Sequence, residues 1–327
     1  EGKRETSHLT SNIHTVEFED GAELLRLNSL SDTVAHTPAK HSRVGMKWTS
    51  LFLDETTFAA LDEAENAAGL TPLGQIAEVD VGIVTGRNSF FILTEAQQAE
   101  FQAASLTVPI IGRTSALKTT CFNKADFGEY QKQYPSFLLN LNGVAYEALP
   151  PEIKEYLKSG EQEDIHRGYK CRIRKRWYDV PSIYIPDAFL FRQIHRYPLL
   201  VVNEAKAAST DTIHRVRVKD GVNIRLLATV FFNSLTLAWA EVCGRSYGGG
   251  VLELEPREAE ELPIFYNDHI AIDTERVEAL LRQDQAYEAL DYCDNIILKN
   301  HLGFDNFMIT KIRHAWEQLR DRRIERK

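Results

Sequence analysis

Residues 166–178 read His-Arg-Gly-Tyr-Lys-Cys-Arg-Ile-Arg-Lys-Arg-Trp-Tyr and place six cations within ten residues without a carboxylate. The cations are Arg167, Lys170, Arg172, Arg174, Lys175 and Arg176, and the aromatic residues Trp177 and Tyr178 follow them. Because charges of one sign repel, the fold needs a reason to hold them together. A polyanion is one reason, since each phosphate met by Lys or Arg releases a counterion and the rings can stack. The alternative is a solvated basic strand or loop with a core tryptophan.

The charge of the chain is distributed unevenly. Over all 327 residues the formal net charge is -9, which alone argues against a nucleic-acid partner. Residues 165–225 nevertheless hold thirteen Lys and Arg against five Asp and Glu, a net charge of +8, which leaves -17 for the remainder. A basic segment in an acidic body produces a localised field, the arrangement expected of a binding face.

The cysteines and the hydropathy pattern exclude other classes. The four cysteines lie fifty or more residues apart, and none forms a Cys or His cluster with metal-ligand spacing. We therefore expect free, partly buried thiols and no metal. No apolar run approaches the roughly 18 residues of a membrane span, and no signal peptide precedes the first predicted strand. These features predict a protein of the reducing cytoplasm without a membrane partner.

The length allows roughly two domains, and three regions differ in apolar content. Residues 1–45 hold one alternating piece from His14 onward, a short helical piece and a polar stretch at 31–43. This region is too poor in apolar residues to fold alone, so we predict the end of a preceding domain plus a linker. We predict that residues 46–265 form the main domain. The apolar residues of 266–327 recur at three and four positions, so we predict that this segment forms a C-terminal helical subdomain.

Periodicity gives a coarse structure for the main domain. Residues 54–68 predict a helix capped by Asp54, and residues 81–93 predict a hairpin of strand, glycine turn and strand. The nearly all-apolar residues 197–202 predict a central strand, and residues 223–242 predict a long apolar helix or a helix with a break. We expect an α+β fold, a mixed β-sheet with flanking helices and a C-terminal helical hairpin.

Three further sets of residues suit binding. Arg87 and Asn88 are predicted at the hairpin turn, where they can pair with guanine and adenine, unless the turn needs them for backbone reasons. Arg215 and Arg217 alternate with apolar residues and so share one face of a strand. The third set is a glycine-rich loop that can approach a sugar-phosphate backbone, or a helix cap followed by a loop. It comprises Arg245, Ser246, Tyr247, Gly248 and Gly249.

The sequence shows no credible catalytic centre. The pair Pro150-Pro151 lacks the preceding Asn or Asp and the following aromatic residue that amino-methylating enzymes use. The glycines at 248–250 are not a phosphate-binding loop, because no Gly-Lys-Ser/Thr follows them. We therefore expect no catalytic residues in this chain.

Several motifs in one order resemble a known family. They are residues 81–93 (VGIVTGRNSFFIL), 171–178 (CRIRKRWY), 209–214 (STDTIH), 233–234 (NS), 244–256 (GRSYGGGVLELEP) and 262–264 (LPI). This series is similar to the C-terminal half of class gamma, TaqI-like N6-adenine DNA methyltransferases of bacterial restriction-modification systems. The resemblance covers about residues 46–265.

The resemblance implies a target recognition domain whose catalytic domain is absent from this chain, apart from its end, which with the linker makes up residues 1–45. In the family, the N-terminal half binds S-adenosylmethionine and carries an Asn-Pro-Pro-Tyr/Phe motif, and neither that motif nor the cofactor glycine motif occurs here. The expected partners are double-stranded DNA and the missing N-terminal methyltransferase domain, and S-adenosylmethionine is expected only for the parent enzyme.

If the motifs have the same roles here as in the family, Arg87 and Asn88 would lie near the DNA and residues 170–178 would contact phosphates and bases. Residues 245–249 would lie near the base that loses its partner when the target adenine is flipped out. Two alternatives stay open at this point. The chain could instead be a protein-interaction module whose basic face docks a methylase or nuclease subunit. It could also be an enzyme whose active site the sequence does not reveal.

Overall fold

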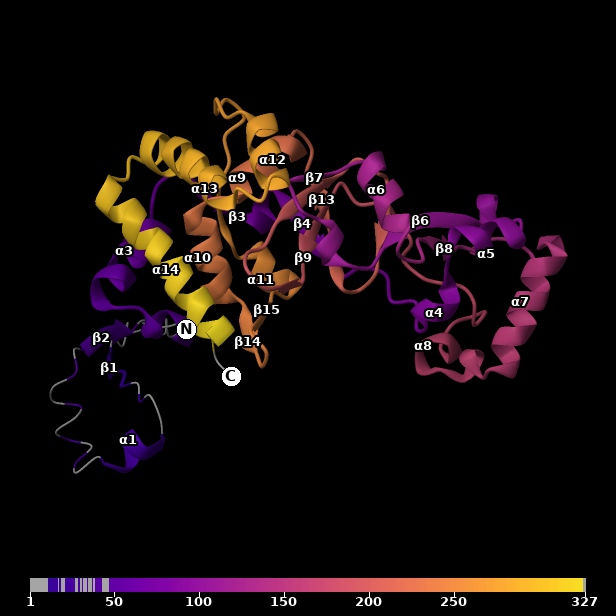
Figure 1. The fold of residues 1–327 in the computed structure, drawn as a ribbon, viewed down its shortest axis with the longest axis horizontal. Helices are drawn as coiled ribbons and strands as arrows, with labels where there is room; N and C mark the ends of the chain where they lie inside the picture. The colour runs from indigo at the N-terminus through magenta and orange to yellow at the C-terminus, as the bar shows by residue number, and fades with distance from the viewer. Residues whose placement is uncertain are drawn as a thin grey trace, which may run out of the picture.

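The computed structural model describes residues 47–325 without a break, and before them residues 11–16, 18, 21–26, 29, 31, 34, 37 and 39–42. In this part of the chain the buried hydrophobic side chains form two clusters. Each cluster is the core of one lobe of an elongated molecule (Figure 1). Helices and mostly antiparallel sheets are mixed in both lobes, which confirms the predicted α+β class.

A five-stranded mixed sheet forms the centre of the larger lobe. Its strands in spatial order are β4 (Ala77–Asp80), β13 (Ile213–Val218), β9 (Ala188–Phe191), β11 (Leu200–Asn203) and β7 (Cys121–Phe122). Neighbouring strands are antiparallel except for the parallel pair β11 and β7. All four residues of β11 are buried, and the strand lies inside the sheet, as its apolar run predicted.

Two consecutive apolar helices lie in the core of the larger lobe, the first packed against β11 and the second against the C-terminal helix. They are α9 (Ile224–Phe231) and α10 (Ser234–Cys243), which meet at an angle of 76°. Between them the side chain of Asn233 accepts hydrogen bonds from the backbone N–H groups of Leu235 and Thr236. The break is therefore a helix N-cap, and of the two predicted forms the broken helix is confirmed.

The C-terminal region is helical, as predicted. It holds α12 (Thr274–Arg282), α13 (Ala286–Asp294), η7 (Asn295–His301) and α14 (Asn306–Glu325). Gly303 has a φ of +74° and separates the last two elements. Side chains such as Leu290 and Trp316 belong to the same core cluster as the five-stranded sheet. The hydrophobic cores therefore show no division at residue 265.

The first residues of the larger lobe follow the sequence prediction in part. Helix α3 (Glu55–Glu65) begins after Asp54, whose carboxylate accepts a 2.9 Å hydrogen bond from the Thr57 N–H, so the predicted cap is confirmed. Before it, β1 (Ser11–His14) pairs with β2 (Ala39–Ser42), and α1 (Gly21–Leu25) lies between them. The first strand thus ends at His14, where it was predicted to begin. The predicted linker at 31–43 includes β2. Residues 17 and 19 of the predicted strand lie outside the described residues.

The smaller lobe is built on a four-stranded sheet. Its strands in order are β12 (Ala208–Ser209), β6 (Thr107–Ile111), β8 (Phe137–Leu139) and β5 (Ile92–Leu93). The helices α4 (Asn88–Phe91), α5 (Glu95–Glu100), α7 (Pro151–Gln162) and α8 (Tyr169–Arg172) surround it. Its core contains Phe90, which stacks on Tyr156 at 4.4 Å between ring centroids.

The hairpin predicted over residues 81–93 is wrong. The chain runs from a single bridge at Ile83 through a turn at Gly86 into the one-turn helix α4, and β5 pairs with β8 instead. Alternating apolar residues suggested two strands, but the buried pair Phe90 and Phe91 occupies the core from a helical turn.

The two lobes meet where two of the family-like motifs cross. The Ile83 N–H donates to the Ser209 carbonyl at 2.7 Å, and Ile83 forms a parallel bridge with Thr210. At Gly82 a Cβ atom would lie 2.0 Å from the Thr210 carbonyl oxygen, so any larger residue would push the strands apart. The motifs at 81–93 and 209–214 therefore build one junction.

Buried thiols and helix lengths complete the description of the fold. All four cysteines are free and buried, which confirms the expected free thiols. Among the described residues no single helix is long and apolar enough to cross a membrane. The bent pair α9 and α10 reaches the length and composition only together, and most of its residues are buried in the core.

We predict that the buried pair of Arg323 and Glu241 stabilises the contact between α14 and α10. The Arg323 guanidinium donates to both Glu241 carboxylate oxygens, at 2.9 and 2.6 Å, and each side chain is 3% exposed. Arg323→Met leaves a buried carboxylate without its partner and should lower the free energy of unfolding by about 3–5 kcal/mol, measured by urea denaturation. Arg323→Met combined with Glu241→Leu should lose less. An unchanged urea midpoint in the single variant would contradict this account.

Candidate nucleic-acid interface

The first part of the basic stretch, residues 166–172, forms short helical turns, and residues 173–178 form a loop of turns and bends, in part as the alternative interpretation expects. The stretch begins in the 3-10 turn Ile165–Arg167, continues through α8 and ends in turns that return to the core. Four of the six cations are exposed and two are partly buried. The six therefore divide into two groups with different surroundings.

Arg174 points into the smaller lobe. Its guanidinium donates to the carbonyl oxygens of Val84 and Thr85, at 3.1 and 2.8 Å, and lies 5.5 Å from the centroid of the Phe91 ring. Burial lowers the pKa of the Arg174 guanidinium, and Cys171 and Asp179 oppose the shift. These contacts join α8 to the turn that precedes α4.

Arg176 also has partners within the lobe. It donates to both carboxylate oxygens of Asp179, at 2.8 and 2.7 Å, and to the Leu141 carbonyl at 3.0 Å, and it contacts the Val144 carbonyl. The hydrogen bond with Asp179 raises the pKa of the Arg176 guanidinium. Contact of Arg174 or Arg176 with DNA stays a prediction, but both are already engaged in holding the lobe together.

The two aromatic residues pack against the core of the smaller lobe. Tyr178 is buried, and the Trp177 ring lies 5.5 Å from the Phe90 ring. The Trp177 indole N–H donates to the Glu161 carboxylate at 3.2 Å. At Gly160 a Cβ atom would lie 2.8 Å from the Trp177 ring, so this glycine makes room for it. The placement fits the core tryptophan of the alternative interpretation.

The four outward cations are Arg167, Lys170, Arg172 and Lys175. Arg167 forms an exposed ion pair with Asp164 at 3.1 Å. Within the described part of the chain Lys170, Arg172 and Lys175 form no ion pair. Three uncompensated cations on one turn and the segment after it make a surface that attracts anions. We call Arg167, Lys170, Arg172 and Lys175 together the basic surface.

The turn with Arg87 and Asn88 lies beside the basic surface. Gly86 has a φ of +88°, and a Cβ there would lie 3.0 Å from the Lys170 Cβ. The Thr85 hydroxyl bonds to the Asn88 side-chain oxygen and accepts from the Arg87 N–H at 3.1 Å. Arg87 and Asn88 are exposed. The structure therefore brings together two of the predicted sets, although on a helical turn and not on a hairpin tip.

Arg215 and Arg217 share one face of β13, as predicted. Their guanidinium groups lie over the Tyr184 ring, at 3.9 and 4.6 Å from its centroid. Arg215 is 4% exposed and contacts the Ser182 carbonyl at 2.6 Å, whereas Arg217 is exposed and lies 3.7 Å from the Glu78 carboxylate. Arg215 is thus a buried structural residue in this structure, and only Arg217 can meet a ligand without rearrangement.

The third predicted set forms a β-hairpin, which corrects the expected loop. Strand β14 (Arg245–Tyr247) pairs with β15 (Val251–Glu253), which also pairs with β10 (Gln193–Ile194). Gly248 and Gly249 lie at its exposed tip. Arg245, Ser246 and Tyr247 are exposed, and Arg245 pairs with Glu258 at 2.8 Å. Arg323 contacts the carbonyl of Gly250, the last residue of the turn between the two strands.

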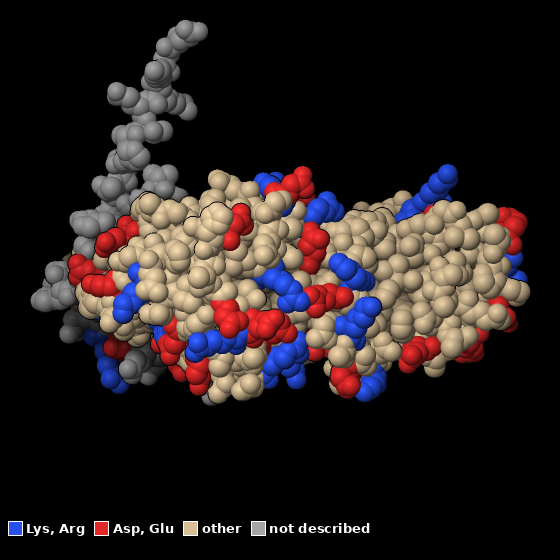
Figure 2. Space-filling view, turned by 90° about the horizontal axis from the view of Figure 1, so that it is seen from above, with Lys and Arg blue, Asp and Glu red and all other residues tan. Residues whose placement is uncertain are grey.

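The three elements that carry exposed predicted residues lie along the same edge of the molecule. In Figure 1, α4 and α8 lie along the lower edge of the smaller lobe, and β14 lies along the lower edge of the larger lobe. The opposite face, seen from above in Figure 2, shows Lys and Arg interspersed with Asp and Glu. The predicted residues on α4, α8 and β14 are therefore brought to one side of the chain.

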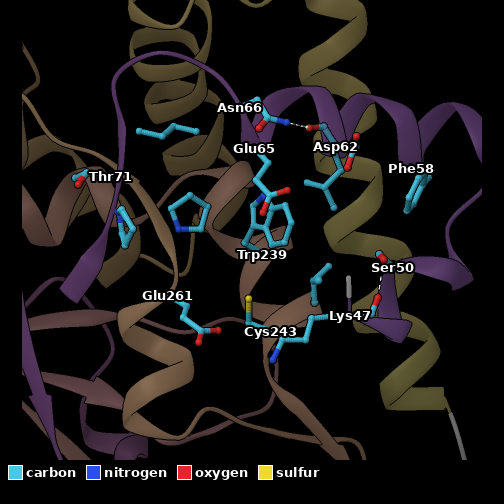
Figure 3. A pocket seen from close by; sticks show the side chains of 15 residues that line it. Lys47, Ser50, Phe58, Asp62, Glu65, Asn66, Thr71, Trp239, Cys243 and Glu261 are labelled. Atoms are coloured by element: carbon cyan, nitrogen blue, oxygen red, sulfur yellow. Dashed lines mark hydrogen bonds between the residues drawn. The ribbon is translucent and has the colours of Figure 1, made fainter. Parts of the chain in front are cut away.

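A pocket of about 560 Å³ lies elsewhere, between α3 and α10 of the larger lobe (Figure 3). Trp239 and Cys243 line it together with Asp62, Glu65 and Glu261. Sequence reasoning did not single out this pocket, since its residues come from distant segments. Its carboxylates do not suit a polyanion, so it is not part of the basic surface. No group of three His, Cys, Asp or Glu side chains in the described chain is arranged to hold a metal ion.

Comparison with known proteins gives the class of this fold. Residues 45–298 match the family described as the C-terminal domain of the type II methyltransferase M.Eco57I. Because the match covers more than half of the chain, the chain belongs to this family of methyltransferase C-terminal domains. The resemblance drawn from the sequence motifs is confirmed at this level, while the adenine target stays a prediction.

Individual relatives are similar to this chain over part of their own length. The type II methyltransferase M.AccI of Acinetobacter calcoaceticus is 28% identical over 196 residues, which are 58% of this chain and 35% of that protein. The fold is similar to the type IIG restriction endonuclease BpuSI, with a TM-score of 0.50 at 15% identity over 89% of this chain and 36% of that one. For the type IIL restriction-modification enzyme MmeI the TM-score is 0.44 at 13% identity, over 77% and 36%. The chain thus spans about a third of these relatives' length.

The division of the cations into two groups gives a prediction about stability. Arg174→Met should lower the free energy of unfolding by about 2 kcal/mol, because two partly buried carbonyl groups lose a charged donor. Arg172→Met, the matched control on the exposed side, should change it by less than about 0.5 kcal/mol. Urea denaturation of both variants checks the difference. Equal stability of the two variants would contradict an anchoring role for Arg174.

Proposed function

We propose that this chain is the DNA-recognition half of a bacterial restriction-modification methyltransferase, and that it binds double-stranded DNA sequence-specifically through the edge bearing α4, α8 and β14. The observation that carries the proposal is the trio Lys170, Arg172 and Lys175, which face outward without ion pairs in the described chain. Phosphates are the counter-charges that such a trio lacks, and phosphate contacts fix the register of a protein on a duplex.

Base reading would come from neighbouring residues. Arg87 and Asn88 lie beside the basic surface and offer the two side chains that pair bidentately with guanine and adenine. On the larger lobe, Ser246 and Tyr247 on β14 are exposed and offer hydroxyl groups. A duplex lying along this edge would meet both lobes.

Catalysis would reside outside this chain. By its family, we expect a methyltransferase domain that binds S-adenosylmethionine to complete the cleft and to methylate an adenine at N6 in the cytoplasm. The chain alone should therefore bind DNA weakly and with strong salt dependence, and transfer no methyl group. Family membership supports this reading, because the matched family is a methyltransferase C-terminal domain.

A salt series tests the proposal. The chain is titrated with a short random-sequence duplex, and the slope of log affinity against log salt is compared with that of Lys170→Ala/Arg172→Ala/Lys175→Ala. Each phosphate contact contributes about 0.9 to the slope, so the triple variant should lose about 2.7. Lys118→Ala/Lys124→Ala/Lys299→Ala removes three exposed charges elsewhere and serves as the control.

Each outcome decides between readings. A flatter slope in the first variant and an unchanged slope in the control support phosphate contact at the basic surface. Equal slopes in wild type and both variants would show that DNA binds elsewhere. No binding by the wild-type chain at low salt would overturn DNA recognition by this chain and favour docking of a protein subunit.

A further inference from the structure

Two large apolar side chains stand in the middle of the basic surface. Tyr169 is 65% exposed and Ile173 is 62% exposed, among the largest exposures of hydrophobic residues in the described chain. Lys170 and Arg172 lie between them in the sequence, and the Lys170 ammonium lies 5.8 Å from the centroid of the Tyr169 ring. An exposed apolar pair surrounded by charge is a common mark of a contact surface.

Helical geometry explains why both side chains point outward, since Tyr169 begins α8 and Ile173 is its C-cap in helical conformation. Cys171 is 2% exposed and belongs to the core of the smaller lobe. At 100° per residue, positions two before and two after an inward residue turn to the opposite side of a helix. Tyr169 and Ile173 are also four residues apart, so they are neighbours on one face. Burial of Cys171 thus fixes the two side chains as one projection.

Contacts with the turn at residues 84–86 hold the segment that carries Tyr169 and Ile173. Arg174, the next residue after Ile173, is tied to the Val84 and Thr85 carbonyls. Gly86 abuts Lys170 so closely that a Cβ would lie 3.0 Å from the lysine Cβ. The backbone that carries Tyr169 and Ile173 is thus held in place before binding, so presenting the two side chains costs little backbone freedom.

The surroundings select the ligand. An occupant of this surface has to satisfy Lys170, Arg172 and Lys175 and at the same time cover two apolar side chains. Phosphates satisfy the cations but offer nothing to Tyr or Ile. A nucleic-acid duplex supplies anions for the cations and apolar surface for Tyr and Ile, because its apolar base faces lie between the two phosphate backbones. Isoleucine is among the side chains that wedge between base steps, and aromatic rings stack on exposed bases.

We propose that Tyr169 and Ile173 form a wedge that enters a DNA base step and partly unstacks it while the neighbouring cations hold the phosphates on either side. This inference rests on the proposed function and adds to it a mode of DNA distortion by the recognition domain itself. It assigns Tyr169 and Ile173 as positioning residues that act on the stack, apart from the base-reading pair Arg87 and Asn88.

Fluorescence of 2-aminopurine tests the wedge. The chain is titrated with a duplex in which 2-aminopurine replaces the adenines of one strand, since this base brightens when it loses its stacking neighbours. Wild-type protein should raise the fluorescence at saturation. Tyr169→Ala/Ile173→Ala should abolish the rise and weaken binding by roughly tenfold, the worth of one stacked base, while the salt slope stays the same.

The control is Tyr146→Ala/Ile185→Ala, which removes the same two residue types from other exposed positions. Tyr146 is 37% exposed and Ile185 is 39% exposed. The control variant should keep the fluorescence rise, as should Tyr169→Phe, which keeps the ring. Binding by the wild type without brighter fluorescence would overturn the wedge and leave the proposed function intact. So would a rise that persists in Tyr169→Ala/Ile173→Ala. Absence of DNA binding by wild type would overturn both.

Discussion

Arg174 donates to the Val84 and Thr85 carbonyls and lies against the Phe91 ring, so one side chain joins α8 to the turn before α4. The arrangement of the exposed residues depends on this contact. With Arg174 turned inward, Tyr169, Lys170 and Arg172 are presented on a fixed turn beside Arg87. A guanidinium group suits the task because its planar fork can reach two carbonyl groups at once.

Much of the fold was predictable because local rules agreed with tertiary structure. Asp54 is a side-chain cap that the sequence predicted, the break within residues 223–242 falls at Asn233, and the apolar run before Asn203 is an interior strand. The hairpin at residues 81–93 failed for a physical reason. A run of apolar residues can fill a core from a strand or from a helical turn, and only the lobe around Phe90 and Phe91 decides which.

The candidate site was predictable in location but not in roles. Cation density identified residues 167–176, and the motif resemblance assigned Arg87 to the same DNA-facing surface, because charge and motif order are properties of sequence. The partners of each cation are not. Arg174 and Arg176 bind backbone carbonyls from segments 30 to 90 positions away, and a carbonyl group leaves no mark in a sequence. Alternation predicted the shared face of Arg215 and Arg217, but not the burial of the former.

The chain passes repeatedly between the two cores. The smaller lobe takes residues from 83–110, 138–180 and 208, while residues 111–134 and 188–207 return to the larger lobe. Recombination therefore cannot exchange the smaller lobe as one cassette between relatives, since any single crossover pair would also carry strands of the other core. A change of the exposed surface would then proceed by substitution on α4, α8 and the β14–β15 hairpin, with the junction at Gly82 and Thr210 carried along unchanged.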